Sequence, residues 1–368
     1  MSTARLLSRR LSTKPTPFTP ASFRPFIERQ GSILLDGGIG TALGAESQRH
    51  VLWGAQHLFR LDGHNKILDM HRKFLEAGAD CISSASYTAS FELFSAAGTF
   101  TDGTLPGGSI TNEKFQHRYT NDVLRASVEL AKKARNDFWA VAQSEQPGRL
   151  RPLVAASVGP AGDNTTVWSG ATDPHRAVHD VPDEVVSLYY RRQCLALSQA
   201  MPDLLAIETL PGLREARLAL AALTDIAPDL AKHGLVVPPV WLSFICTSDT
   251  ATAAGDDFGE AAAEVARHAG VHAVGVNCVA PSLIEPLLRR ARAACGPETI
   301  LLAYPNSGEV WDSRQEERCW HAGGQGDEVL DGTHAIRMRR AGADGIGGCC
   351  RVGAEQIRVF REALLASE

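Results

Sequence analysis

Short apolar runs alternate with longer amphipathic segments along the chain from residue 32 onward. Each run breaks at a glycine or a polar residue, as a buried strand does where it leaves a sheet. The runs predict eight strands, at 32–35, 80–84, 153–157, 204–207, 240–245, 273–276, 300–303 and 345–347. The amphipathic segments predict helices at 66–77, 121–136, 183–199, 213–223, 258–268, 283–294, 334–341 and 354–365. Strand and helix therefore alternate through almost the whole chain.

This alternation defines the predicted fold class. Eight strand and helix pairs in a chain of 368 residues suit an α/β protein of the (β/α)8 type, the TIM barrel. An open, doubly wound sheet satisfies the same alternation and remains the alternative. We predict one barrel domain over residues 30–368, after an N-terminal extension over residues 1–29. Two polar, glycine-rich stretches, at 95–114 and 310–329, predict surface loops.

Residues with distinctive chemistry lie where the predicted strands end. Asp36-Gly37 follows the first strand, Thr88 lies after the second, and Glu208 ends the fourth. Asn277-Cys278 follows the sixth strand and Cys349-Cys350 the eighth. Active sites of barrels are built at the carboxyl ends of the strands, so a barrel brings these residues to one face. The sequence therefore predicts the active site there.

Cys278, Cys349 and Cys350 are candidate ligands of a metal ion. Neighbouring cysteines close a disulfide only with strain, so a reduced pair meeting a third thiol favours a site for a soft metal. Three protein ligands leave the fourth position of zinc open, which is typical of catalytic zinc. The alternative is a set of small buried residues in a tight strand. The other cysteines, expected in the core, are Cys81, Cys194, Cys246, Cys295 and Cys319.

Composition narrows the classes of partner. The formal net charge is -5 with a pI near 6.2, and the basic residues are scattered, so no nucleic-acid partner is expected. No apolar stretch is long enough for a bilayer, so no membrane partner is expected either. Eight cysteines are too few for a disulfide scaffold in a chain of this length, which favours a reducing, cytoplasmic location.

The N-terminal extension is basic. Arg5, Arg9, Arg10, Lys14 and Arg24 precede the first acidic residue, Glu28. A disordered tail is one interpretation of this stretch. A mitochondrial transit peptide is the other, because such peptides are rich in arginine and poor in acidic residues.

Seven motifs in order give the chain a family resemblance. They are Asp-Gly-Gly at 36–38, Ser-Val-Gly-Pro at 157–160, Glu-Thr-Leu-Pro at 208–211, Ser-Phe at 243–244, Gly-Val-Asn-Cys at 275–278, Tyr-Pro-Asn-Ser-Gly-Glu at 304–309 and Gly-Gly-Cys-Cys-Arg at 347–351. In these motifs the chain resembles the homocysteine S-methyltransferase family, from about residue 30 to its end. The two cysteine motifs are the most specific part of the resemblance.

The resemblance implies an activity and a role for each candidate residue. Members of similar length transfer a methyl group from S-methylmethionine or S-adenosylmethionine to L-homocysteine, which yields L-methionine. Cys278, Cys349 and Cys350 match the zinc ligands, and zinc holds the homocysteine sulfur as a thiolate. Glu208 matches a residue that binds the α-amino group of homocysteine. Further residues implied at the substrate are Asp36 with the Gly37 amide, Asn277 beside a zinc ligand, Thr88, Tyr304 and Ser307.

The methyl donor is less well defined by the sequence. Ala161 stands where many relatives carry an aromatic residue after the proline. The resemblance implies that this position shapes the donor pocket, so the pocket is expected to differ here. Trp53 and Trp168 are candidate aromatic contacts for a sulfonium cation. Betaine, which related members use, remains an alternative donor, and Asp36 has an alternative role as a helix cap. A barrel with a structural zinc and no catalysis is the alternative from another functional class, and it requires a fourth protein ligand.

Overall fold

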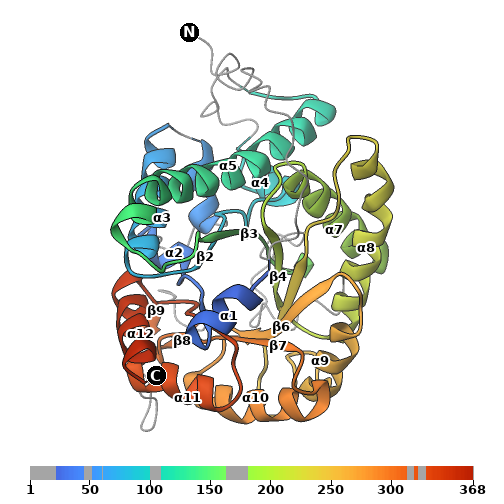
Figure 1. Ribbon diagram of the computed structural model, residues 1–368. Helices are drawn as coiled ribbons and strands as arrows, with labels where there is room; N and C mark the ends of the chain where they lie inside the picture. The colour runs from blue at the N-terminus through green and yellow to red at the C-terminus, as the bar shows by residue number, and fades with distance from the viewer. Residues whose placement is uncertain are drawn as a thin grey trace.

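A computed structural model describes residues 22–44, 52–59, 61–99, 109–162, 181–312, 319–321 and 329–367 (Figure 1). Within these residues, eight parallel strands form one sheet, in the order β1-β10-β7-β6-β5-β4-β3-β2. The strands are β1 (Ile33–Leu34), β2 (Cys81–Ser83), β3 (Leu153–Val158), β4 (Leu204–Leu210), β5 (Val240–Phe244), β6 (Val271–Asn277), β7 (Ile300–Tyr304) and β10 (Gly345–Ile346). A parallel bridge between Leu35 and Cys81 joins the two ends of the sheet. This closure confirms the predicted barrel and excludes the open sheet.

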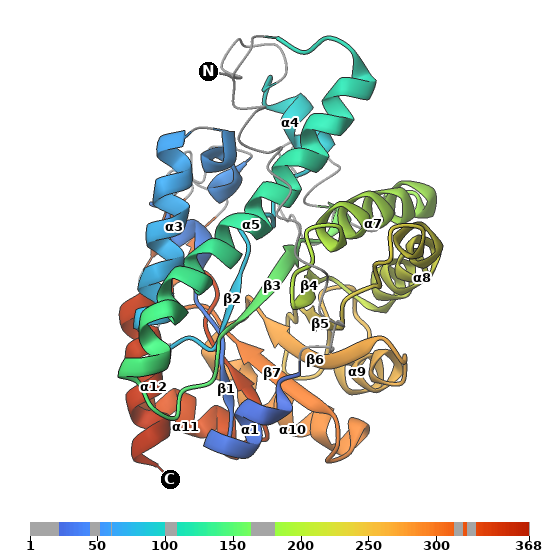
Figure 2. The same cartoon turned by 45° about the horizontal axis from the view of Figure 1, so that its top comes forward.

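Helices surround the barrel between successive strands (Figures 1 and 2). They are α1 (Arg24–Gln30), α2 (Ile39–Ala42), the 3-10 helix η2 (Trp53–Phe59), α3 (Leu61–Glu76), α4 (Phe91–Ala96), α5 (Glu113–Glu145), α7 (Asp183–Ser198), α8 (Leu213–Ala231), α9 (Phe258–Ala266), α10 (Pro281–Cys295), α11 (Gly332–Arg340) and α12 (Ala354–Ala366). Every predicted helix is present. The helix predicted at 121–136 is longer at both ends. At its amino end, Asn112 caps α5 ahead of the apolar periodicity.

Two predicted features differ from the structure. The stretch at 310–329 contains an antiparallel hairpin, formed by β8 (Val310–Asp312) and β9 (Cys319–His321), so it is not wholly a loop. The predicted domain boundary at residue 30 falls at the end of α1, which packs onto the barrel. Residues 1–21 of the predicted extension lie outside the described residues.

The segment around α1 closes the amino-terminal end of the barrel. Phe23 and Phe26 are buried together with side chains of the barrel interior. The Phe23 ring lies 5.8 Å from that of Trp241 and 5.1 Å from that of His272, centroid to centroid. The Phe23 backbone N–H also donates to His272 Nε2 at 3.0 Å. This end of the barrel is therefore filled by packing, which leaves the carboxyl end for chemistry.

Three aspartates tie neighbouring strands together at the amino-terminal end. Each directly precedes a strand, accepts a hydrogen bond from a backbone N–H of the adjacent strand, and pairs with an arginine. Asp80 accepts from Leu34 and pairs with Arg361, Asp203 accepts from Val154 and pairs with Arg135, and Asp344 accepts from Leu301 and pairs with Arg292. These contacts satisfy strand N–H groups that the short ladders leave open.

Removing one of these charges is expected to destabilise the barrel. In Asp344→Asn the ion pair with Arg292, 2.7 Å long and partly exposed, is lost. We expect the free energy of unfolding to fall by about 1–2 kcal/mol, measured by denaturant titration. The control is Asp69→Asn. The Asp69 carboxylate pairs with Arg72 and Lys73 on the surface of α3, and its loss is expected to lower the free energy of unfolding by less than about 0.5 kcal/mol. Equal losses in both variants contradict the assignment.

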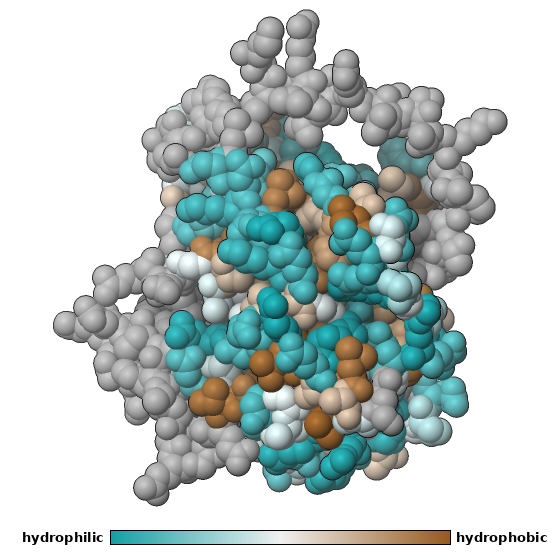
Figure 3. All heavy atoms as spheres, turned by 60° about the vertical axis from the view of Figure 1, so that its left-hand side comes forward, coloured by the Kyte–Doolittle hydropathy of each residue, from teal (hydrophilic) through white to brown (hydrophobic). Residues whose placement is uncertain are grey.

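The face of the molecule shown in Figure 3 is mostly polar. On the face in Figure 3, apolar side chains are scattered among hydrophilic ones. None of the helices in the described part of the chain combines the length and the apolarity needed to cross a bilayer.

Candidate active site

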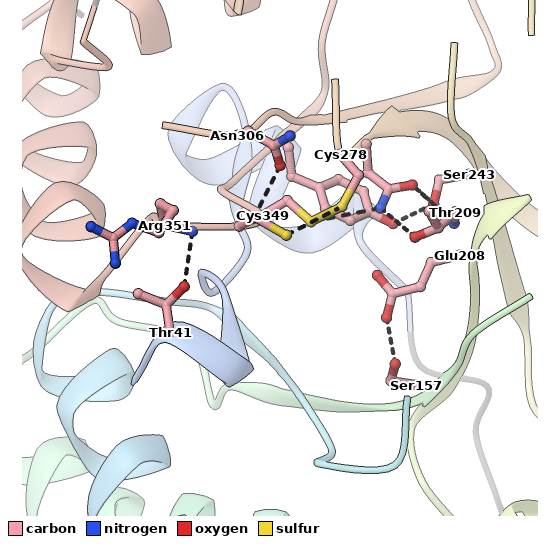
Figure 4. The surroundings of a disulfide bond; sticks show 12 residues. Thr41, Ser157, Glu208, Thr209, Ser243, Cys278, Asn306, Cys349 and Arg351 are labelled. Carbon is pink, nitrogen blue, oxygen red and sulfur yellow. Dashed lines mark hydrogen bonds between the residues drawn. A yellow bond between two sulfur atoms is a disulfide. The ribbon is translucent and has the colours of Figure 1, made fainter. Parts of the chain in front are cut away.

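The three candidate metal ligands meet at the carboxyl end of the barrel (Figure 4). Cys278 directly follows β6, and Cys349 and Cys350 lie in the turn after β10. These strands flank β7 in the sheet. The three sulfur atoms lie within 4.8 Å of one another, and Cys278 Sγ is 3.8 Å from Cys350 Sγ. Parallel strands thus deliver thiols 71 residues apart in sequence to one point.

One expectation about these sulfurs is not met in the structure. We expected three reduced thiols, but Cys278 and Cys349 are joined by a disulfide, with Cys350 free. The strand ends hold the Cα atoms of Cys278 and Cys349 5.5 Å apart, which is a separation that a disulfide spans. Metal ligands must be thiolates, so the reduced chain is the form able to bind a metal ion.

Several residues at this end of the barrel adopt the left-handed backbone conformation. Within the described residues, four residues other than glycine have positive φ, and three of them lie here. They are Thr209 at 64°, Cys278 at 54° and Arg351 at 66°. Such conformations persist only where surrounding contacts hold them, and they are often found at functional sites.

The inward faces of the strands change from apolar to polar toward the sulfur group. Alternate residues of a strand face the same side. Leu204 and Ala206 of β4 and Trp241 of β5 are buried in the barrel interior, so Glu208 and Ser243 share their face. The same alternation, with the contacts below, defines a polar layer made of Ser157, Glu208, Ser243, Asn277 and Tyr304.

Asn277 connects this polar layer to a cysteine. Its Oδ1 accepts from the Thr209 backbone N–H at 3.0 Å and from the Ser243 hydroxyl at 2.9 Å. Its Nδ2 donates to Thr209 Oγ1 at 2.8 Å and lies 3.9 Å from Cys349 Sγ. Asn277 thereby holds Thr209 and supports the sulfur group, while its predicted contact with substrate stays a prediction.

Glu208 points into the barrel from a bulge in β4. The strand runs to Leu210, beyond the predicted end at 207, and its pairing with β5 shifts between Ile207 and Leu210. Bulges of this kind re-aim side chains beside active sites. The Ser157 hydroxyl donates to Glu208 Oε1 (Figure 4). Burial raises the pKa of Glu208 to about 7, although hydrogen bonds from Ser157 and Tyr304 oppose the rise.

Asp36 is a second carboxyl group at the same end, and its side chain is buried. Its Oδ2 accepts from the Ser83 backbone N–H at 2.7 Å and its Oδ1 from the Ser83 hydroxyl at 3.2 Å. Burial, with a smaller contribution from the charge of Glu208, raises the pKa of Asp36 to about 8, although the hydrogen bonds from Ser83 oppose the rise. A nearby cation such as an ammonium group stabilises the charged form of both carboxyl groups and offsets the repulsion between them. Asp36 and Glu208 together therefore suit a cationic ligand. A Cβ on Gly37 meets the Val352 carbonyl oxygen at 2.3 Å, so this close approach requires glycine.

The remaining predicted residues differ in their positions. Tyr304 belongs to the polar layer, where its hydroxyl bonds to Ser243 and accepts from Trp241 Nε1. The Thr88 hydroxyl donates to the Leu52 carbonyl at 2.8 Å, a contact between two loops. Ser307 donates to Glu309 at 2.9 Å. Roles for Thr88 and Ser307 at the substrate stay predictions.

The predicted donor region is only partly described. Ala161 is fully buried, and its backbone N–H donates to Glu215 Oε1 at 2.6 Å. Trp168 lies outside the described residues, as does the side chain of Trp53. Their role as contacts of the donor stays a prediction.

Sequence reasoning assigned no role to Ser157 or Ser243. Both are polar residues inside apolar strands. Ser157 lies two positions after the inward Ala155, and Ser243 lies two positions after the inward Trp241, so each shares the inward face of its strand. That parity is visible in the sequence once the strands are placed, and it identifies hydroxyl groups that face the barrel interior.

The donor set fits a thiophilic metal ion. Within the described residues, the metal-ligand group consists of Cys278, Cys349 and Cys350, with no fourth protein ligand. Three thiolates with one position left suit zinc that binds a substrate. The structural-zinc alternative needs a fourth protein ligand, and the described residues offer none.

Comparisons with known proteins agree with this geometry. The sequence profile of the homocysteine S-methyltransferase family matches residues 33–364. Homocysteine S-methyltransferase 4 of Zea mays is 33% identical over 94% of this chain and 94% of its own length. Homocysteine S-methyltransferase 1 of Arabidopsis thaliana is 30% identical over 91% of this chain and 94% of its own.

A solved structure extends the comparison to the fold. The homocysteine methyltransferase MmuM from Escherichia coli, in its metallated form, matches with a TM-score of 0.70 and 28% identity. The match covers 94% of this chain and 99% of MmuM. Profile, sequences and structure all span nearly the whole chain. The chain therefore belongs to the homocysteine S-methyltransferase family.

Proposed function

We propose that this chain transfers a methyl group from a sulfonium donor to the thiol of L-homocysteine, with Zn2+ bound by Cys278, Cys349 and Cys350. The observation that carries the proposal is the group of three sulfurs at the carboxyl end of the barrel, where the carboxyl groups of Asp36 and Glu208 also lie. The names of the relatives and the metallated form of MmuM support it.

The metal ion, when bound, keeps the acceptor sulfur as a thiolate at neutral pH, where a free thiol is mostly protonated. The residues of the chain position the rest of homocysteine. Glu208, with Asp36, binds the α-amino group, and Ser157 and Tyr304 fix the orientation of the Glu208 carboxylate. Such fixed orientation lowers the entropic cost of reaching the attacking geometry.

The preferred donor is S-methylmethionine, with S-adenosylmethionine as a second substrate. A sulfonium loses its positive charge as the methyl group leaves, so a site of low polarity favours the transfer. Ala161 has a small side chain where many relatives carry an aromatic one, and this leaves more room for an adenosyl group. Resemblance to the shorter members that use sulfonium donors supports this choice over betaine.

Parallel assays test the proposal. Methionine formation from homocysteine is measured with S-methylmethionine, S-adenosylmethionine and betaine, using reduced protein supplied with Zn2+ and the same protein treated with a chelator. We expect transfer from both sulfonium donors, faster with S-methylmethionine, and none after chelation. Betaine as the best donor contradicts the donor assignment alone. No transfer from any donor contradicts the proposed function.

A further inference from the structure

The turn that carries Cys349 and Cys350 is docked against the segment after β7. The Cys349 backbone N–H donates to the Pro305 carbonyl at 2.8 Å. The Cys350 N–H donates to Asn306 Oδ1 at 3.2 Å (Figure 4), and the Cys350 carbonyl accepts from the Ser307 N–H at 3.1 Å. Two of the three proposed metal ligands therefore depend on this segment for their position.

The next residue, Arg351, fastens the turn at two points. Its backbone N–H donates to Thr41 Oγ1 at 2.8 Å, which holds the turn to α2 (Figure 4). Its guanidinium binds Glu309 with both nitrogens, Nε to Oε2 at 2.8 Å and Nη2 to Oε1 at 3.1 Å. Ser307 also donates to Glu309 Oε2, at 2.9 Å. A bidentate pair of this kind fixes the relative orientation of the groups it joins.

We infer that the Glu309–Arg351 pair is a positioning pair, which sets the Cys349–Cys350 turn at the distance from Cys278 that metal binding requires. The inference rests on the proposed metal-binding function. Arg351 is in the left-handed region, with φ 66°, so its conformation needs contacts that hold it. When the ion pair is lost, the turn keeps its backbone contacts but loses the contact that fixes the side chain of its left-handed residue.

The exposure of the Glu309–Arg351 pair distinguishes a role in positioning the metal ligands from a role in stabilising the fold. The side chains of Arg351 and Glu309 are 38% and 29% exposed. Ion pairs as exposed as this one contribute little to the free energy of unfolding. Outer contacts that orient metal ligands, in contrast, commonly change metal affinity by 10- to 100-fold. The expected effect is therefore on the metal and not on the fold.

The experiment compares Arg351→Met, Glu309→Gln and the double variant with the wild type. The dissociation constant of Zn2+ is measured by competition with a chromophoric chelator, on fully reduced protein without oxygen. Each single substitution is expected to weaken Zn2+ binding by roughly 10- to 100-fold. The double variant is expected to be no weaker than the weaker single variant, because both substitutions break the same contact.

A matched control comes from Arg217 and Glu264, which join α8 to α9 by an equivalent bidentate pair, with contacts of 2.6 and 2.8 Å. Arg217→Met and Glu264→Gln are expected to bind Zn2+ as the wild type does. Thermal melts identify variants that are folded. If Arg351→Met does not fold, the isosteric Glu309→Gln carries the test.

The outcomes are distinguishable. The inference is overturned if folded Glu309→Gln binds Zn2+ as tightly as the wild type does. It is also overturned if the losses of Zn2+ affinity in the two single variants multiply in the double variant, or if the Arg217 and Glu264 variants lose as much Zn2+ affinity as the Arg351 and Glu309 variants. A wild-type chain that binds no Zn2+ overturns the proposed function instead.

Discussion

Cys350→Ala is expected to reduce methyl transfer to homocysteine below detection and to lower bound Zn2+ from about one ion per chain to a small fraction of that. Cys350 supplies one of three sulfurs within 4.8 Å of one another, and two thiolates are too few for a stable site of this kind. The measurements are metal content after dialysis, turnover with S-methylmethionine, and a thermal melt. The melt is expected to resemble that of the metal-free wild type, because Cys350 is only partly buried.

Cys246→Ala is the control for this substitution. Cys246 also follows a strand end, that of β5, but it is buried in the apolar core outside the sulfur group. The Cys246→Ala variant is expected to bind as much Zn2+ as the wild type and to keep most of its activity. Full activity in Cys350→Ala contradicts the assignment of the site.

Glu208→Gln is expected to raise the KM for homocysteine and to lower kcat/KM by roughly one to two decades. The carboxylate is proposed to bind the α-amino group, and loss of a charge-assisted hydrogen bond costs about 1.5–3 kcal/mol. Its dependence on pH gives a second test. Because the pKa of Glu208 is about 7, the carboxyl group is increasingly protonated below that pH and loses its attraction for an ammonium group. The wild-type KM should therefore rise as the pH falls below 7. This rise should be smaller in Glu208→Gln, where only Asp36, with a pKa of about 8, still titrates beside the ammonium group.

Glu264→Gln provides the control, since that carboxylate lies on the surface of α9 and pairs with Arg217. It is expected to leave KM and its pH dependence unchanged. An unchanged KM in Glu208→Gln assigns Glu208 a structural role, with the Ser157 contact as its reason.

The contacts around Glu208 illustrate what can be predicted from a single chain. Its place at a strand end followed from the apolar run before it. Its inward direction did not follow, because every residue of that run is apolar and only the structure shows that Leu204 and Ala206 face the barrel interior. The bulge at Thr209 and the hydrogen bond from Ser157 did not follow, because both depend on how β4 is aligned with its neighbours. Strand register is decided by packing across the whole barrel, which no local pattern contains.

By itself, the sequence determined the alternation of strands and helices, the barrel as the favoured class, and the end of the barrel where Asp36, Glu208 and the three cysteines belong. These follow from periodicity and from breaks at glycine and polar residues, which are local properties of the chain.

Only the tertiary structure decided the closure of the sheet by Leu35 and Cys81, the packing of Phe23 into the barrel, and the pairing of Glu309 with Arg351. It also decided that Cys278 pairs with Cys349 in a disulfide. Each of these contacts joins residues 42 or more positions apart in the chain. They form only when the closed barrel brings its strand ends and loops together, so the spacing of residues in the sequence does not encode them.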